Sequence, residues 1–193
     1  EMEQHFIEMK YTPAKEEEFY TKRMNWPKGN REQQVTEWDN IAATNKPLPD
    51  LTGWECTVGI DYASLRDWAA VNVHFKKGDQ RYDFGRYWVC TQNPELERVK
   101  APWREWKECV PIDAVEIAPE LLTEYILEVG QKHNIKMLAL DNYRYALMRD
   151  ALEKIGFSKD RENLYLVRPS DIMKIQPVID SCFNKQLFIW GDN

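Results

Sequence analysis

The pattern of hydrophobic and polar residues changes after Pro49, where short segments rich in β-branched and aromatic residues begin. Within residues 69–75 apolar side chains alternate with polar ones, which buries one face of a strand and leaves the other wetter. His74 falls on the wetter face, where a lone histidine is usually surface decoration, so we leave it out of the site. The turn-forming run 76–80 ends this segment. We therefore predict a meander of strands at 56–61, 69–75 and 82–90.

The rest of the chain alternates between helical and strand patterns. Pro119 and Glu120 suit the first turn of a helix from Ala118, whose apolar stripe ends before Gly130. Prolines and tryptophans make residues 91–117 an irregular connection, with a helical turn around Trp103 to Glu108. The remaining predicted elements are a strand at 136–141, a helix at 145–155 ending at Gly156, a strand at 164–167, a helix after the N-cap Ser170 and a strand at 187–190.

Two aspartates close two of the predicted strands. Helical crossovers after a meander favour a mixed sheet, in which the strands ending at Asp61 and Asp141 lie side by side. Both carboxylates would then stand at the carboxyl ends of the strands, where open α/β sheets place their ligands. Ionised carboxylates near a core repel each other, and a shared divalent metal compensates for this directly. The alternative is that each aspartate only caps a turn, and the residues by themselves leave both open.

Composition limits the choice of function. The chain has 193 residues, enough for one domain, and its residues 1–50 carry breaks that indicate an arm. The net charge of −6 counts against nucleic acid as the obvious partner, so any DNA binding must be local or assisted by metal. The scattered cysteines predict reduced thiols and no zinc site. No apolar run is long enough to cross a bilayer, so we expect a soluble, intracellular protein.

Four segments together resemble one protein family. Residues 58–64 with Asp67, and residues 138–144, are similar to the two nuclease motifs of the large terminase subunit of tailed bacteriophages. Residues 21–26 resemble the segment that joins the family's ATPase domain to its nuclease, and residues 168–173 and 186–193 fit in order and spacing. Each motif alone is weak, but the series in this order covers nearly the whole chain.

This resemblance implies an α/β nuclease domain over residues 51–193, with an RNase H-like mixed sheet of five strands flanked by helices. Such a domain cuts concatemeric double-stranded DNA during genome packaging, with Mg²⁺ or Mn²⁺ in a two-metal site. Its implied catalytic metal ligands are Asp61 and Asp141. Further candidates are Asp67 and Asp192 as metal ligands, and Arg66, Tyr143 and Arg144 as DNA contacts.

The resemblance also sets expectations about the parent protein. Residues 1–50 would be the arm from an ATPase domain, which this chain lacks because no phosphate-binding Gly-Lys-Ser/Thr loop occurs in it. The family's third metal-binding acid lies beyond the equivalent of residues 190–193. We therefore expect a domain truncated before its last helix, whose own activity is an open question. The implied partners are DNA, the ATPase domain, the small terminase subunit and the portal protein, in the cytoplasm of the bacterial host.

Two alternatives stay open at this point. The chain could be another RNase H-like nuclease, of the resolvase or integrase type. It could also be a catalytically silent interaction domain whose aromatic arm docks on a partner protein. Binding of a divalent ion that disappears when Asp61 is replaced by asparagine separates an enzyme from a silent domain.

Overall fold

The computed structural model describes residues 36–63, 65, 67–99 and 101–191. The chain divides into two compact units, Glu1–Glu37 and Trp38–Asn193, and the fold below is that of the second. Most of the predicted arm, including the segment 21–26, lies outside the described residues. Residues 38–50 belong to the second unit, where the amide of Gly191 donates to the carbonyl oxygen of Lys46 over 3.1 Å.

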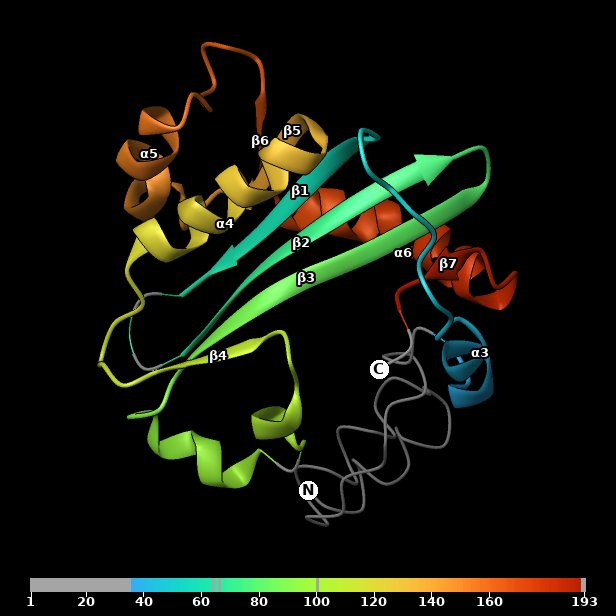
Figure 1. The fold of residues 1–193 in the computed structure, drawn as a ribbon, viewed down its shortest axis with the longest axis horizontal. Helices are drawn as coiled ribbons and strands as arrows, with labels where there is room; N and C mark the ends of the chain where they lie inside the picture. The colour runs from blue at the N-terminus through green and yellow to red at the C-terminus, as the bar shows by residue number, and fades with distance from the viewer. Residues whose placement is uncertain (1–35, 64, 66, 100, 192–193) are drawn as a thin grey trace, which may run out of the picture. The chain divides into compact units, whose positions relative to one another are not determined.

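A mixed sheet of seven strands forms the centre of this unit (Figure 1). Its order is β4-β3-β2-β1-β5-β6, and β7 pairs with β3. The first three strands form the predicted antiparallel meander, while β4, β5, β6 and β7 each pair in parallel with a neighbour. The strands are β1 (Glu55–Tyr62), β2 (Trp68–Lys77), β3 (Gln80–Cys90), β4 (Cys109–Ile112), β5 (Asn134–Asp141), β6 (Leu164–Val167) and β7 (Phe188–Ile189).

Helices lie on both faces of the sheet (Figure 1). The packed core is on the α4 and α5 side, where Ile60 and Leu140 are buried together with Leu122 and Met148. The helix α6 lies on the opposite face (Figure 1). The helical elements are α3 (Trp38–Ala43), α4 (Pro119–Lys132), α5 (Tyr145–Lys154) and α6 (Pro169–Asn184), with short 3-10 turns η2 (Pro94–Arg98) and η3 (Trp103–Glu105).

The sheet differs from the expected one in its number of strands, which is seven instead of five. The strand β4 lies inside the connection that the sequence predicts to be irregular. The sequence pattern did not predict this strand because it contains Pro111. Proline cannot donate a backbone hydrogen bond to a neighbouring strand, so within sheets it is confined to positions such as an edge strand. The strand β4 is such an edge, since it pairs only with β3 among the described strands.

The start of α6 also differs from the prediction. The helix begins at Pro169 and its N-cap is Arg168, so Ser170 lies inside the first turn. The cause is Asp171, whose Oδ2 accepts a hydrogen bond from the backbone amide of Arg168 over 3.0 Å. Proline at the first helical position suits this start, because the amide it lacks has no partner inside a helix.

Two local predictions are confirmed, one about the end of α5 and one about Trp103. Gly156 has a φ of 90° and ends α5 in the left-handed conformation. Trp103 is buried and packs edge-on against Trp68, with 5.8 Å between ring centroids, so it anchors its loop to the core. The four cysteines are free thiols. In the described part of the chain, none of the helices is both long and apolar enough to span a bilayer.

Candidate active site and an adjoining cavity

Parallel pairing of β1 and β5 brings the two strand-end aspartates together. Ile60 pairs with Leu140 across the two strands, and Asp61 and Asp141 are the next residues on each. Ile60 and Leu140 are buried in the core, so the alternation of side chains turns both aspartates to the α6 face. Asp61 is exposed and Asp141 is half-buried. The two carboxylates therefore occupy adjacent positions on one face of the sheet.

Asp141 also has a structural role. Its Oδ1 accepts a hydrogen bond from the backbone amide of Tyr143 over 3.0 Å, and its carbonyl oxygen accepts one from Arg144 over 3.1 Å. These bonds fix the turn that leads into α5. The turn-capping alternative is therefore correct for Asp141 Oδ1. This bond holds the carboxylate in place, and no hydrogen bond to its Oδ2 is found within the described residues.

The other candidate metal ligands are not assembled with this pair. Asp67 is exposed, and its Oδ1 accepts a hydrogen bond from the amide of Trp68 over 2.9 Å, which makes it a cap for the start of β2. Asp192 and Arg66 lie outside the described residues. Among the described residues, no three histidine, cysteine, aspartate or glutamate side chains gather closely enough to hold a metal ion. The described site thus offers two carboxylates.

The candidate DNA contacts that can be placed are both on the surface. Tyr143 is 76% exposed, which excludes the packing role that the sequence left open for it. Arg144 is exposed in the same turn, directly before α5. Both residues lie in the turn that follows Asp141, at two and three positions after it, so a bound phosphate near the carboxylates would lie within reach of this turn.

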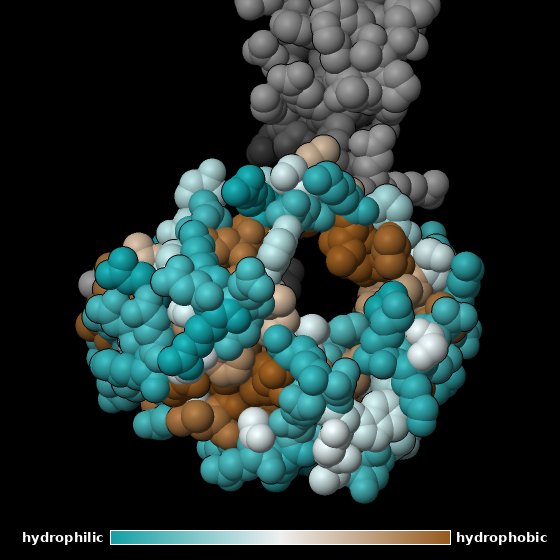
Figure 2. Space-filling model, turned by 90° about the horizontal axis from the view of Figure 1, so that it is seen from above, coloured by the Kyte–Doolittle hydropathy of each residue, from teal (hydrophilic) through white to brown (hydrophobic). Residues whose placement is uncertain are grey.

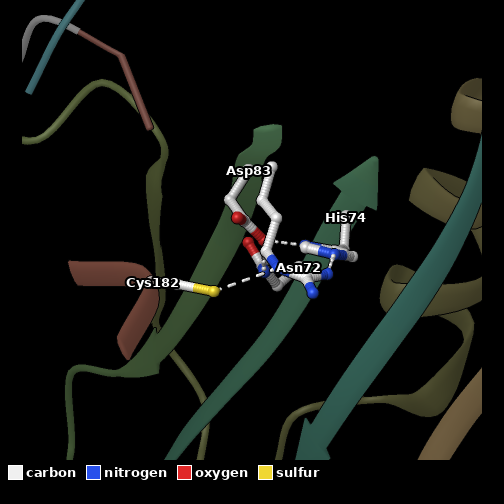
Figure 3. Close-up of polar contacts among 5 residues, drawn as sticks. Asn72, His74, Asp83 and Cys182 are labelled. Atoms are coloured by element: carbon white, nitrogen blue, oxygen red, sulfur yellow. Dashed lines mark hydrogen bonds and ion pairs between the residues drawn. The ribbon is translucent and has the colours of Figure 1, made fainter. Parts of the chain in front are cut away.

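A polar cluster that the sequence analysis missed lies on the same face of the sheet (Figure 3). Asp83 Oδ1 accepts hydrogen bonds from Asn72 Nδ2 over 3.0 Å and from His74 Nδ1 over 2.9 Å. Arg81 Nη1 lies 3.5 Å from His74 Nε2, and Arg81 Nε donates to the Sγ atom of Cys182 on α6 over 3.2 Å. His74 is therefore half-buried in a network, and its interpretation as surface decoration is wrong.

A cavity of about 470 Å³ separates this face of the sheet from α6. Its floor includes Gly59 and Ala139, and its polar end is formed by the cluster on β2 and β3. Its roof is the apolar side of α6, formed by Ile175, Val178 and Ile179. Seen from above, a hollow enters the molecule, with hydrophobic residues along one part of its rim and hydrophilic residues along another (Figure 2). The cavity is open to solvent, since Ile175 and Val178 are 52% and 46% exposed. Its volume falls in the range of small-molecule sites, roughly 300–1,000 Å³, which makes it a candidate binding site.

The cavity adjoins the aspartate pair. Gly59 and Ala139 pair with each other across β1 and β5, and each precedes its aspartate by two residues on the same face. At about 3.3 Å per residue, the floor of the cavity lies roughly 7 Å from the carboxylate positions. Whatever binds at Asp61 and Asp141 therefore lies beside the mouth of this cavity.

Comparison with known proteins bears on the fold. No family model matches the sequence, and no curated protein matches it significantly. Among solved structures, the HK97 bacteriophage large terminase superposes with a TM-score of 0.66 and 15% sequence identity. The match covers 97% of this chain and 40% of that protein. The fold resembles that of a phage large terminase.

A second match is the large terminase of a thermophilic bacteriophage, with a TM-score of 0.49 and 14% identity over 82% of this chain and 32% of that one. The likeness to the HK97 protein confirms the expected RNase H-like α/β fold, a mixed sheet flanked by helices. Because the sequence identity is low, this structural likeness shows the fold alone. The chain spans about 40% of the length of the HK97 protein.

Proposed function

We propose that this chain is the nuclease domain of a phage large terminase and that it cuts concatemeric double-stranded DNA during genome packaging. The observation that supports this most is the placement of Asp61 and Asp141 side by side at the ends of two parallel strands. A capping role explains one oxygen of Asp141, but it gives no reason for an exposed second carboxylate next to it. The overall likeness to the HK97 terminase agrees with this proposal.

The residues present fit a divalent ion in part. Carboxylate oxygens are the hard ligands that Mg²⁺ and Mn²⁺ prefer, and Asp61 and Asp141 would hold such ions. A pair of these ions, when bound, activates a water molecule and stabilises the leaving oxygen of a phosphodiester. No third carboxylate joins them in the described part of the chain, so water or residues outside that part would complete the coordination.

The protein's own groups would orient both the ions and the DNA. The bond from the Tyr143 amide holds one carboxylate oxygen of Asp141, which fixes the direction of the other. The exposed side chains of Tyr143 and Arg144 would contact the DNA backbone, and Arg66 would do so from the turn after β1. With a net charge of −6, the chain would bind DNA through such local contacts and the ions.

The proposal places this chain in a larger assembly. Residues 1–50 would connect it to an ATPase domain, and its further partners would be the small terminase subunit and the portal protein, in the cytoplasm of the infected or prophage-carrying bacterium. Asp67 and Asp192 stay candidates for additional ligands under this proposal. Asp67 Oδ1 accepts a hydrogen bond from the Trp68 amide, so under this proposal Asp67 would act through its Oδ2 atom and a water bound to the metal.

The direct test is binding of Mn²⁺ by the purified chain, measured by calorimetry at neutral pH, together with nicking of supercoiled plasmid. Asp61→Asn and Asp141→Asn should each abolish metal binding. A matched control is Asp79→Asn, which removes an exposed aspartate in the turn between β2 and β3 and should change nothing. Metal affinity that survives Asp61→Asn would rule out this site.

Nicking would distinguish between the remaining possibilities. Plasmid nicking that requires Asp61 supports the endonuclease directly. Metal binding without nicking keeps the site but leaves cutting to the larger protein. If neither metal binding nor nicking is found, the catalytically silent interaction domain becomes the better interpretation, because the carboxylates would then serve only the turns.

A further inference from the structure

We propose that Arg144 and Arg168 together hold the DNA backbone, so that the duplex passes over the β5–β6 side of the aspartate pair. This inference rests on the proposed function and deepens it, because it adds Arg168 as a DNA contact and gives the DNA a direction. Two observations carry it: both arginines lie at one edge of the sheet beside Asp141, and charge is distributed unevenly along that edge.

Arg168 lies one residue beyond the strand that borders Asp141. Val167 is the partner of Asp141 in the parallel pairing of β5 with β6, and Arg168 follows it directly. The amide of Asn142 donates to the carbonyl oxygen of Val167 over 3.1 Å, and the amide of Arg144 donates to that of Asp141 over 3.1 Å. These two bonds hold the turn that carries Arg144 against the end of β6. The backbone therefore fixes both arginines beside the candidate site.

Both guanidinium groups are available for a phosphate. Arg144 and Arg168 are exposed, and neither forms an ion pair within the described residues. The alternative for Arg168 is a purely structural ion pair with Asp171 in the first turn of α6. The Asp171 carboxylate instead accepts the backbone amide of Arg168 over 3.0 Å and lies 3.9 Å from Lys174 Nζ. A guanidinium group offers two parallel N–H donors, which suit the oxygens of a phosphate.

The charge of the sheet edge differs on the two sides of the aspartate pair. The strands β1, β3, β4, β5 and β6 run in one direction, so the loops after them lie at the same edge. On the β3–β4 side, residues 91–117 carry six acidic and four basic residues, and Asp113 and Glu116 are exposed after β4. On the β5–β6 side, residues 142–174 carry seven basic and five acidic residues. A polyanion is therefore favoured on the β5–β6 side.

This contact would hold a phosphodiester at the carboxylates. A duplex anchored on Arg144 and Arg168 would leave the aspartate pair over β5 and β6, away from the acidic connection 91–117. Contacts to the DNA backbone fix the register of a protein on its DNA without reading the bases. We therefore expect the two arginines to position the strand that is cut and to add no preference for a sequence.

The test is the salt dependence of duplex DNA binding, measured by fluorescence anisotropy in EDTA between about 50 and 200 mM NaCl. Each phosphate contact contributes about 0.9 to the slope of log affinity against log salt concentration. Arg144→Ala and Arg168→Ala should each reduce this slope by about 0.9, and the double variant by about 1.8. The matched control is Lys107→Ala, which removes an exposed base on the β3–β4 side and should leave slope and affinity unchanged.

A conservative variant separates a DNA contact from a structural role. Arg168→Lys keeps the charge and should keep the slope, while its affinity falls because an ammonium group lacks the paired donors. Thermal unfolding reports whether each variant is folded. An unchanged slope in Arg168→Ala, an equal loss in Lys107→Ala, or absence of duplex binding by the unmodified chain would overturn the inference.

The outcome is separate from that of the proposed function, because the titration uses no divalent ion and involves no cleavage. A reduced slope without any nicking would keep the DNA surface and reject the nuclease. Nicking that requires Asp61, together with an unchanged slope in Arg168→Ala, would keep the nuclease and reject this surface.

Discussion

The contact between Tyr62 and Ile117 holds the end of β1, and its removal has a predictable cost. Tyr62 directly follows Asp61, is 1% exposed, and its hydroxyl donates to the carbonyl oxygen of Ile117 over 2.7 Å. Ile117 is fully buried, so water cannot replace the lost donor. The substitution Tyr62→Phe leaves a buried carbonyl without this partner, which costs about 1–3 kcal/mol of unfolding free energy.

The same contact predicts a dependence on alkaline pH. Burial, and to a lesser extent the charges of Glu116 and Glu120, raise the pKa of Tyr62 to about 12. The phenol of an unfolded chain has a pKa of about 10. Below pH 10 both states keep the proton and the contribution of Tyr62 is complete. Between about pH 10 and 12 the unfolded state releases the proton first, so this contribution is progressively lost as the pH rises.

Urea unfolding followed by tryptophan fluorescence measures both effects. The difference in unfolding free energy between the unmodified chain and Tyr62→Phe should be largest at pH 8 to 9 and should shrink toward pH 12. Contributions of other groups cancel in this difference. Tyr143→Phe, at a position that is 76% exposed, is the control and should stay within about 0.5 kcal/mol at every pH. A loss below about 0.5 kcal/mol for Tyr62→Phe at pH 8 would refute the reasoning.

Three further predictions follow from local geometry. Gly85→Ala should destabilise the fold by about 1–3 kcal/mol in urea unfolding, because its new side chain would stand 2.7 Å from the backbone oxygen of Val71. Gly59→Val should instead raise stability by up to about 1 kcal/mol, since its side chain meets open space and valine favours strands. The double variant of Asp61 and Asp141 should cost no more Mn²⁺ binding in calorimetry than either single variant alone, because the pair shares ions. Residual binding in one single variant that only the double variant removes would show that the two carboxylates act as separate sites.

The candidate pair could be predicted from the sequence because its signal is local. Each aspartate ends a run of apolar residues, and a helical crossover between such runs requires parallel strands that share one carboxyl edge. The parallel pairing with Ile60 opposite Leu140 confirms this prediction. The roles of the two aspartates as metal ligands stay a prediction, because the structure gives the positions of their side chains and does not test the binding of a metal ion.

The polar cluster was missed because it depends on hairpin register. We predicted a long turn over 76–80, with the third strand starting at residue 82. The strands in fact continue to a two-residue turn at Gly78 and Asp79, where Gly78 has a φ of 58°. This tight turn pairs Lys77 with Gln80 and therefore His74 with Asp83. A glycine between two strand patterns is a known signal of a two-residue hairpin turn. A hairpin predicted with this turn would have placed His74 opposite Asp83.

The cavity could not have been predicted from the sequence. Ile175, Val178 and Ile179 recur with the spacing of an ordinary buried helix face, and nothing in the pattern separates a helix that touches the sheet from one that stands off it. The gap becomes visible only when the small floor residues Gly59 and Ala139 are placed beneath α6. It is a property of tertiary packing and has no local signature.

The parallel pairing of β1 with β5 also determines when the candidate site can exist during folding. The β1–β2–β3 meander consists of neighbouring segments and can close through short loops, whereas β5 must return past the whole meander and α4 to reach β1. Closure of such a long loop is entropically unfavourable and slow. A nascent or cleaved chain that stops before residue 134 could form the meander with Asp61 exposed, but it would lack the second carboxylate. Under the proposed function, metal affinity would therefore appear only after the central pairing of the sheet is complete.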